Sequence, residues 1–304
     1  MAVLNRKFAI QFPLLIACAY IPFSASAGPL LGADLASFTV LGASMVTNVR
    51  TSVIGGSVGV WPSGAIIGFN SSPGVAVSDP QLTGGSVHAG TTIAQAAQGQ
   101  LTSAIVDLGS LGSGTTLAIA DMAGLTLAPG VYTVSAGATN LSGTLILDGQ
   151  GSANAAWVFQ MPSTLITSPN SVVEIINTGS GAGLYWDVGS SATVASNTAF
   201  LGNILAHVSI TMDSTATDTC GRVLANTGAV SLNMNSLSSN CTGALSGSGG
   251  LGGGLDVSTT PGGTTVTTFI HSAKAPEINA ASAASALTLL FGGLAVARGR
   301  RRSA

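Results

Sequence analysis

Charged side chains are scarce in this chain. Lysine, arginine, aspartate and glutamate make up 7% of its 304 residues, whereas about a quarter of the residues in a typical soluble domain are charged. Between Gly28 and Ala275 only Arg50, Arg222 and Lys274 are basic, against ten carboxylates, which gives a net charge of −7. Nucleic acids are bound largely through neutralisation of phosphates by lysine and arginine, so this composition predicts no nucleic-acid partner.

Groups that could carry out catalysis are also few. The nine carboxylates from Asp34 to Asp218 lie at least five residues apart, so no acid pair of the kind that cleaves polysaccharides is evident. The histidines, His88, His207 and His271, have no partner residue nearby in the sequence. No Gly-x-Ser-x-Gly, HExxH or P-loop sequence occurs. The sequence therefore predicts a protein that is not an enzyme and that uses no metal or cofactor, with a polysaccharide lyase as the least favoured alternative.

Cysteine is rare as well, with three residues. Cys18 belongs to the leader described below, which leaves Cys220 and Cys241. In an exported chain an even pair of cysteines indicates a disulfide, and this one would close a loop of about twenty residues. Two isolated cysteines without a neighbouring histidine do not predict a metal site.

The N-terminus carries a targeting signal. Arg6 and Lys7 precede an apolar run and the small-x-small sequence Ala25-Ser26-Ala27. Residues 1–27 are therefore predicted to be a secretory signal peptide, with a buried N-terminal helix as the alternative. We expect the protein to be exported to the cell surface or the medium.

The C-terminus carries a second signal, over residues 275–304. Ala275-Pro276-Glu277-Ile278 is followed by an apolar stretch at residues 280–297 and by a cluster of arginines. The stretch is long enough to span a bilayer, with the arginines on the cytoplasmic side. This order of features resembles the PEP-CTERM type of bacterial sorting signal, whose tail is removed or exchanged at the cell surface. The resemblance implies transient membrane anchoring; a permanent anchor is the alternative.

One domain, residues 28–241, lies between the two signals. Short runs of apolar or β-branched residues recur in it, separated by glycine, asparagine, serine or aspartate, which is typical of short strands joined by turns. Residues 242–274 are rich in glycine, serine and threonine and are predicted to be a flexible linker.

An imperfect repeat is present in the second half of the domain. Residues 159–165 match residues 186–192, and two shorter units begin at Ile204 and Val223. Strands this short cannot build a sandwich, so a repeat of about twenty residues predicts coils stacked as a parallel β-solenoid.

One segment has helical rather than strand periodicity. Between Val87 and Leu108 apolar residues recur at helical spacing, with Ser86 as a candidate N-cap and Gly109 as a candidate end. The apolar stripe of this helix can be buried only if the helix lies along the solenoid. His88 falls at the predicted helix start, in a capping or packing role.

The small polar clusters of the repeats fall in register. Residues 168–171 align with residues 195–198, and residues 213–217 and 233–236 follow. Alternate side chains of a strand point the same way, and stacked strands lie about 4.7–4.9 Å apart. Outward serine, threonine and asparagine would form a flat lattice that orders water at spacings near those of ice. The alternative is that serine and threonine simply suit an exposed strand surface.

Several segments, in order from Leu31 to about Asn235, resemble the DUF3494 ice-binding family. They include Phe38-Thr39-Val40-Leu41, Leu125-Thr126-Leu127-Ala128-Pro129-Gly130-Val131-Tyr132, Trp157-Val158-Phe159-Gln160 and Phe200-Leu201-Gly202-Asn203-Ile204-Leu205-Ala206. The resemblance implies an all-β-dominated fold: a discontinuous right-handed parallel β-solenoid of triangular cross-section with one long α-helix packed alongside. It also implies adsorption of a flat, threonine-rich face to ice, and hence inhibition of ice recrystallisation.

Carried over to this sequence, the resemblance implies an ice-binding face of eight residues. They are Thr167, Asn170, Ser196, Thr198, Ser214, Thr215, Thr217 and Asn235. Ala195, Asp213 and Met234 interrupt the columns, so modest activity is expected. The alternative function is a cell-envelope or biofilm-matrix adhesion protein that binds exopolysaccharide, which the sorting tail suggests.

Overall fold

The structure, a computed structural model, describes residues 27–134, 137–260 and 263–268. The predicted signal peptide, except for Ala27, and the predicted sorting tail with its apolar span of residues 280–297 lie outside these residues. Within the described part of the chain, no helix is long and apolar enough to cross a membrane.

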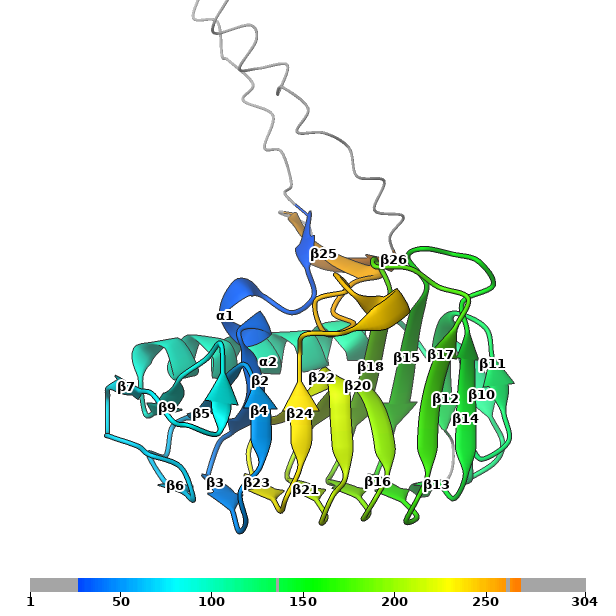
Figure 1. The fold of residues 1–304 in the computed structure, drawn as a ribbon. Coiled ribbons are helices and arrows are strands. Elements are labelled where there is room, and N and C mark those ends of the chain that lie inside the picture. The colour runs from blue at the N-terminus through cyan, green and yellow to red at the C-terminus, as the bar shows by residue number, and fades with distance from the viewer. Residues whose placement is uncertain (1–26, 135–136, 261–262, 269–304) are drawn as a thin grey trace, which may run out of the picture.

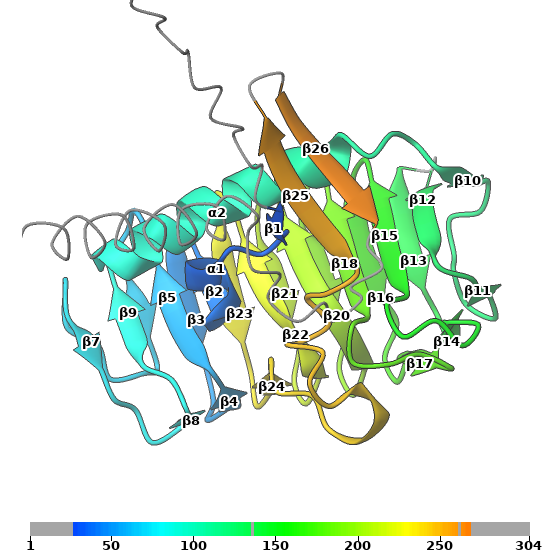
Figure 2. The same ribbon diagram turned by 90° about the horizontal axis from the view of Figure 1, so that it is seen from above.

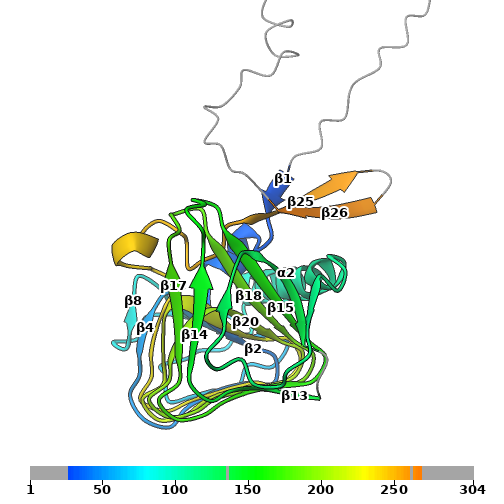
Figure 3. The ribbon, with the colours of Figure 1, turned by 90° about the vertical axis from the view of Figure 1, so that its right-hand side faces the viewer.

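Parallel strands stack into coils with three sides, which we call the coil stack (Figures 1 and 3). The strands of the first side, in spatial order, are β10 (Thr115–Leu117), β12 (Gly130–Val134), β15 (Ala156–Met161), β18 (Gly183–Val188), β20 (Ala199–Ala206), β22 (Thr217–Ala225), β2 (Phe38–Gly42), β5 (Ser57–Val60), β9 (Val87–Ala89) and the antiparallel β7 (Ala76–Val77). Strand β22 lies beside β2, so coils from the two ends of the domain meet inside the stack.

The other two sides are built in the same way. The β16 side consists of β13 (Ala138–Leu141), β16 (Thr164–Thr167), β19 (Ala192–Val194), β21 (Ile210–Met212), β23 (Ala229–Leu232), β3 (Met45–Asn48) and β6 (Ile66–Ile67). The β17 side consists of β11 (Thr126–Leu127), β14 (Thr144–Asp148), β17 (Val172–Ile176), the first residues of β20 and β22, β24 (Ser236–Ser238), β4 (Val53–Gly55) and β8 (Leu82–Thr83).

Aromatic side chains stack inside the coils. Tyr132, Phe159 and Trp186 occupy the same position on β12, β15 and β18. The ring centroids of Phe159 and Trp186 are 4.3 Å apart, and those of Tyr132 and Phe159 are 5.6 Å apart. A slip of one residue would turn these rings to the opposite face of their strands, so their burial holds the register of neighbouring coils.

One main helix, α2 (Thr92–Gly109), runs along the first side of the coil stack (Figure 2). Leu101, Ala104 and Leu108 on its inner face are fully buried. The predicted helix beside the strands is thus confirmed, but it starts five residues later than expected from the sequence. Thr91, not Ser86, is the N-cap, and its hydroxyl accepts a hydrogen bond from the backbone N–H of Ala94.

Residues 87–89 form strand β9 instead of the first helical turn. Their Val-His-Ala sequence continues the parallel pairing with β5, and Gly90 at φ +66° then turns the chain towards the helix. His88 is 7% exposed, lies edge-on to Phe38 at 5.2 Å, and its Nδ1 is 3.2 Å from the hydroxyl of Thr91. It packs as predicted, but from a strand rather than from the helix start.

The segment predicted to be a flexible linker is structured over much of its length. It contains a 3-10 turn, η1 (Gly243–Leu245), and the strands β25 (Leu255–Thr260) and β26 (Gly263–Thr268). These two strands form an antiparallel sheet with β1 (Ala27–Pro29) at the N-terminal end. The predicted disulfide between Cys220 and Cys241 is present and joins this segment to β22.

Buried polar side chains explain why a glycine-rich sequence is ordered here. Arg222 is 3% exposed and donates hydrogen bonds to the carbonyls of Ala36 and Gly250. The amide of Asn203 donates to the carbonyls of Gly250 and Leu251. Composition alone does not reveal these bonds, because they are made to backbone atoms of the segment.

A buried carboxyl group lies inside the β17 side. Asp218 is 1% exposed, and its Oδ2 has no hydrogen-bond partner among the described residues. Burial raises the pKa of Asp218 well above its usual value, against the opposing effects of the Cys220 N–H and the Arg222 charge. The folded protein therefore favours the neutral acid over the carboxylate more than the unfolded chain does.

The Asp218→Asn variant tests this protonation state. The unfolded parent releases this proton near pH 4, whereas the folded parent keeps it to higher pH, so its free energy of unfolding falls as the pH rises through that window. Asparagine has no proton to lose. In urea unfolding at a series of pH values, we expect the stability of the variant relative to the parent to increase above about pH 4. A difference that does not change with pH would contradict the raised pKa.

Candidate functional surface

Two polar sites, a histidine–aspartate pair and a cavity lined by Arg222, do not belong to the β16 or the β17 side of the coil stack. His207 Nε2 is 3.2 Å from Asp187 Oδ1, and burial raises the pKa of Asp187 while His207 opposes the rise. The two members of this pair are 20 residues apart, and no sequence motif links them. The pair joins β18 to the end of β20. Among the described residues, no group of three or more histidine, cysteine or acidic side chains is placed to hold a metal ion.

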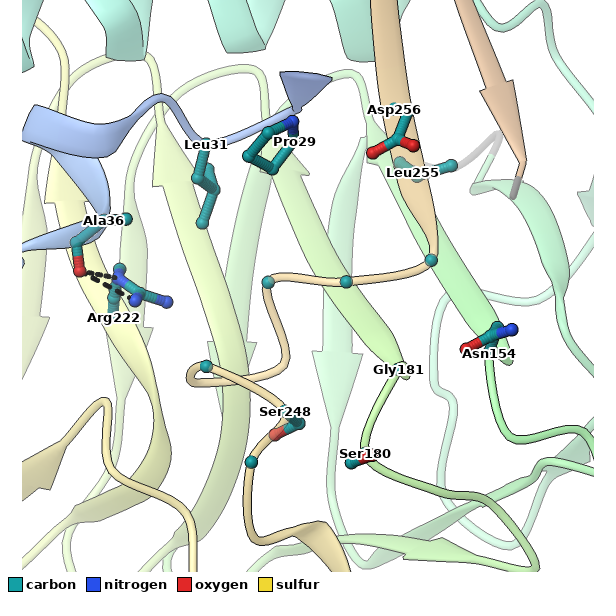
Figure 4. Close-up of a pocket in the computed structure, with 15 residues that line it drawn as sticks. Pro29, Leu31, Ala36, Asn154, Ser180, Gly181, Arg222, Ser248, Leu255 and Asp256 are labelled. Carbon is teal, nitrogen blue, oxygen red and sulfur yellow. Dashed lines mark hydrogen bonds between the residues drawn. The ribbon is translucent and has the colours of Figure 1, made fainter. Parts of the chain in front are cut away.

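A cavity of about 440 Å³ separates the coil stack from the C-terminal segment (Figure 4). Arg222, Asn154 and Asp256 line it together with glycine backbone. The guanidinium of Arg222 is held by the carbonyl of Ala36, as Figure 4 shows, and by Asn203 Oδ1 at 2.9 Å. The guanidinium also donates to the carbonyl of Gly250, so the charge helps to attach the C-terminal segment.

The β17 side of the stack carries a regular outward column. Thr144, Val172, Ala199, Thr217, Ser236 and Val53 occupy the same position on six successive strands. All six, which we call the β17 column, are uncharged and at least partly exposed. Helix α2 covers a different side of the stack, so this column faces outwards (Figure 3). Small and β-branched side chains in parallel register make the β17 column flat.

The β16 side carries a second outward column, which the sequence did not reveal. Its members share one position on seven strands: Asn140, Ile166, Thr193, Thr211, Ser231, Thr47 and Ile67. Its hydroxyl groups are flanked at the two ends by Ile166, 42% exposed, and Ile67, 55% exposed. The only sequence signal is a serine or threonine at this position on four of the seven strands, namely β19, β21, β23 and β3.

The corner between these two sides forms a ridge. Asn170, Asn197, Thr215 and Met234 are exposed and all have positive φ, between 54° and 64°. We call these four residues the corner ridge. They come from the four polar clusters that the sequence analysis aligned, and in the structure they lie at the same corner of successive coils. Backbone N–H groups of the ridge donate to the next coil, for example from Asn170 to Ser196 and from Asn197 to Ser214.

Five of the eight predicted face residues lie on this outer surface. Asn170 and Thr215 are on the corner ridge, Thr217 is in the β17 column, and Ser196 and Ser214 lie beside the ridge and are partly exposed.

The other three predicted face residues are buried, and the prediction is wrong for them. Thr167, Thr198 and Asn235 are 3%, 0% and 2% exposed. The hydroxyls of Thr167 and Thr198 are 3.1 Å apart, and the amide of Asn235 donates to the carbonyls of Asp213 and Ala216. Backbone groups at the corner turn inwards and need partners, so these polar side chains serve the interior.

Thr215 is more strained than the two asparagines at the same position of the corner ridge. A β-branched residue at φ +64° is unfavourable, whereas asparagine tolerates this conformation, as Asn170 and Asn197 do on adjacent coils. We therefore expect Thr215→Asn to raise the free energy of unfolding by up to about 1 kcal/mol in urea unfolding. The reciprocal Asn197→Thr should lower it by a similar amount. Equal stability of both variants and the parent would contradict this strain.

The sequence and the fold of this chain are similar to those of known proteins. Residues 40–238 match the family model described as ice-binding-like, and residues 275–304 match a VPEID-CTERM protein sorting domain. An ice-binding protein of Nostoc sp. (strain HG1) is 37% identical over 79% of this chain and 86% of its own length. The ice-binding protein of Flavobacterium frigoris is 27% identical over 66% of this chain and 73% of its own. The crystal structure of an ice-binding protein from the Antarctic ascomycete Antarctomyces psychrotrophicus superposes with a TM-score of 0.62 at 29% identity, over 71% of this chain and all of that one.

Proposed function

The chain belongs to the ice-binding-like family, and from this premise we propose that it binds ice without catalysis, through the β17 column and the corner ridge. Adsorbed molecules stop the ice front locally, so the protein inhibits growth and recrystallisation of ice. We also propose that its coil stack is the discontinuous right-handed β-solenoid of triangular cross-section implied by the sequence. The β22–β2 junction, the three sides and the single long helix support this description.

The observation that carries the proposal is the β17 column itself. Six successive strands present hydroxyl and methyl groups at one position, about 4.8 Å apart along the stack. The inward neighbours Leu145, Phe200 and Leu237 are almost fully buried, which holds the strands rigid. Each group contacts ice weakly, so binding requires that many groups engage together on a flat and rigid surface.

Charge distribution favours the strip formed by the β17 column and the corner ridge. Glu174 is exposed two positions further along β17, and Asp213 is partly exposed on the opposite flank of the ridge. A carboxylate holds its hydration shell strongly, so close contact with ice is favoured between these two charges.

The comparisons also concern the alternative function, adhesion to exopolysaccharide, and the localisation of the protein. The relatives and structures reported above are named for ice binding, and nothing in them supports adhesion to exopolysaccharide. The matched sorting domain supports export to the cell surface. We propose that residues 1–27 act as the signal peptide for this export and that the tail anchors the chain transiently.

Tyrosine substitutions on the strip test the proposal. The double variant Ala199→Tyr with Thr217→Tyr places two bulky rings on adjacent strands of the β17 column. The single variant Thr215→Tyr places one ring on the corner ridge. Rings that protrude from the strip prevent close contact between the strip and the ice surface. We expect the concentration needed to inhibit recrystallisation to rise about tenfold or more, with unfolding curves that match the parent.

The matched control is Thr193→Tyr with Thr211→Tyr, two adjacent positions of the β16 column. This variant should keep activity near that of the parent. A parent protein that neither shapes ice crystals nor slows recrystallisation would rule out ice binding, and loss of activity in the control alone would move the site to the β16 side.

A further inference from the structure

Open strand edges are blunted over almost all of the structure. The outermost strands of the coil stack have two residues in β6, β7, β8 and β11, and three in β10. The edge of β13 is occupied, because Asn140 exchanges backbone hydrogen bonds with Ala120 and Met122. In the small antiparallel sheet, the edge strand β1 has three residues and ends in Pro29. Short or covered edges protect a sheet from pairing with other chains.

Strand β26 is the exception among the described strands. It has six residues, pairs with β25 on one side, and has no strand on its other side within residues 27–134, 137–260 and 263–268. Its sequence Gly-Thr-Thr-Val-Thr-Thr contains no charge and no proline, and five of its six residues are β-branched. Such a strand has none of the features that prevent edge-to-edge pairing. Thr264, Thr265 and Thr267 are exposed.

Exposed apolar surface lies next to this edge. A groove of about 800 Å³ runs between helix α2 and the sheet, and Thr264, Val257 and Val106 line it. Val106 is 66% exposed. A strand added to β26 would therefore find apolar surface beside the open backbone groups.

We propose that β26 pairs antiparallel with β26 of a second copy of this chain, which makes the protein a two-fold symmetric dimer. The partner is identified by the sequence of the strand, because residues 264–268 read Thr-Thr-Val-Thr-Thr in both directions. An antiparallel pair with its two-fold axis at Val266 places Val266 opposite Val266 of the partner subunit. It also places Thr265 opposite Thr267 of the partner subunit, so identical chemistry meets across the axis.

The dimer leaves the ice-binding strip free. Figure 3 shows the sheet of β1, β25 and β26 at the top of the coil stack, with the β17 side on the left and the β16 side at the bottom. Each dimer particle therefore carries two such strips. This consequence rests on the proposed function, whereas the dimer itself does not.

A pair of charge variants tests both the dimer and its register. Thr265→Lys with Thr267→Lys brings like charges face to face twice across the axis. Thr265→Glu with Thr267→Lys brings a glutamate opposite a lysine twice instead, and as in the first variant a lysine stands opposite Asp256 on β25. Both variants alter the same two exposed side chains, so the fold is conserved in each.

The measurement is sedimentation equilibrium on residues 27–274, which contain every described strand and helix, at about 0.1 mM protein. We expect twice the chain mass for the parent and for the glutamate–lysine variant, and the single-chain mass for the lysine–lysine variant. A parent with the single-chain mass overturns the dimer. A lysine–lysine variant that keeps the doubled mass overturns pairing through β26 about Val266. Ice shaping by the lysine–lysine variant reports separately on the proposed function.

Discussion

The parallel register between successive coils is the constraint on which the structure depends. No strand of three to six residues buries enough apolar surface to be stable alone, so each coil is stabilised by the coils above and below it. Parallel pairing repeats one position of the coil at a fixed spacing along the stack. Inside, this repetition stacks Tyr132, Phe159 and Trp186. Outside, it arranges Thr144, Ala199, Thr217 and their neighbours into one column. The rigid interior and the proposed ice-binding strip are therefore two results of the same register.

Polar groups maintain that register where strands end. At the corner ridge the backbone turns through positive φ on four coils, and buried Thr167, Thr198 and Asn235 bond to the groups that turn inwards. On the middle strands β20 and β22 of the first side, Asn203 and Arg222 bond to the carbonyls of the C-terminal segment. These side chains are polar because they complete backbone hydrogen bonding, which also excludes them from contact with a ligand.

Much of this organisation follows from the sequence. The repeat spacing and the helical periodicity identified stacked parallel strands and one helix, and the alignment of Asn170 with Asn197 and Thr215 was correct. Periodicity did not distinguish outward from inward polar side chains at a corner, which is why Thr198 and Asn235 were placed on the surface. It also missed Val172, Ala199 and Val53, because their exposure depends on where each coil turns. Glycine-rich composition concealed the order of residues 243–260, since the bonds that fix them come from distant side chains.

If the repeated register presents a surface that binds ice irreversibly, the protein stays on an ice crystal after the protein in the surrounding solution is removed, and direct adsorption measures this. An ice crystal is grown in a solution of the fluorescently labelled protein, and the solution is then exchanged for protein-free liquid at the same temperature. Our account predicts that fluorescence stays on the crystal surface and that growth there remains arrested after the exchange. Fluorescence that is excluded from the ice and washes away with the liquid would contradict it.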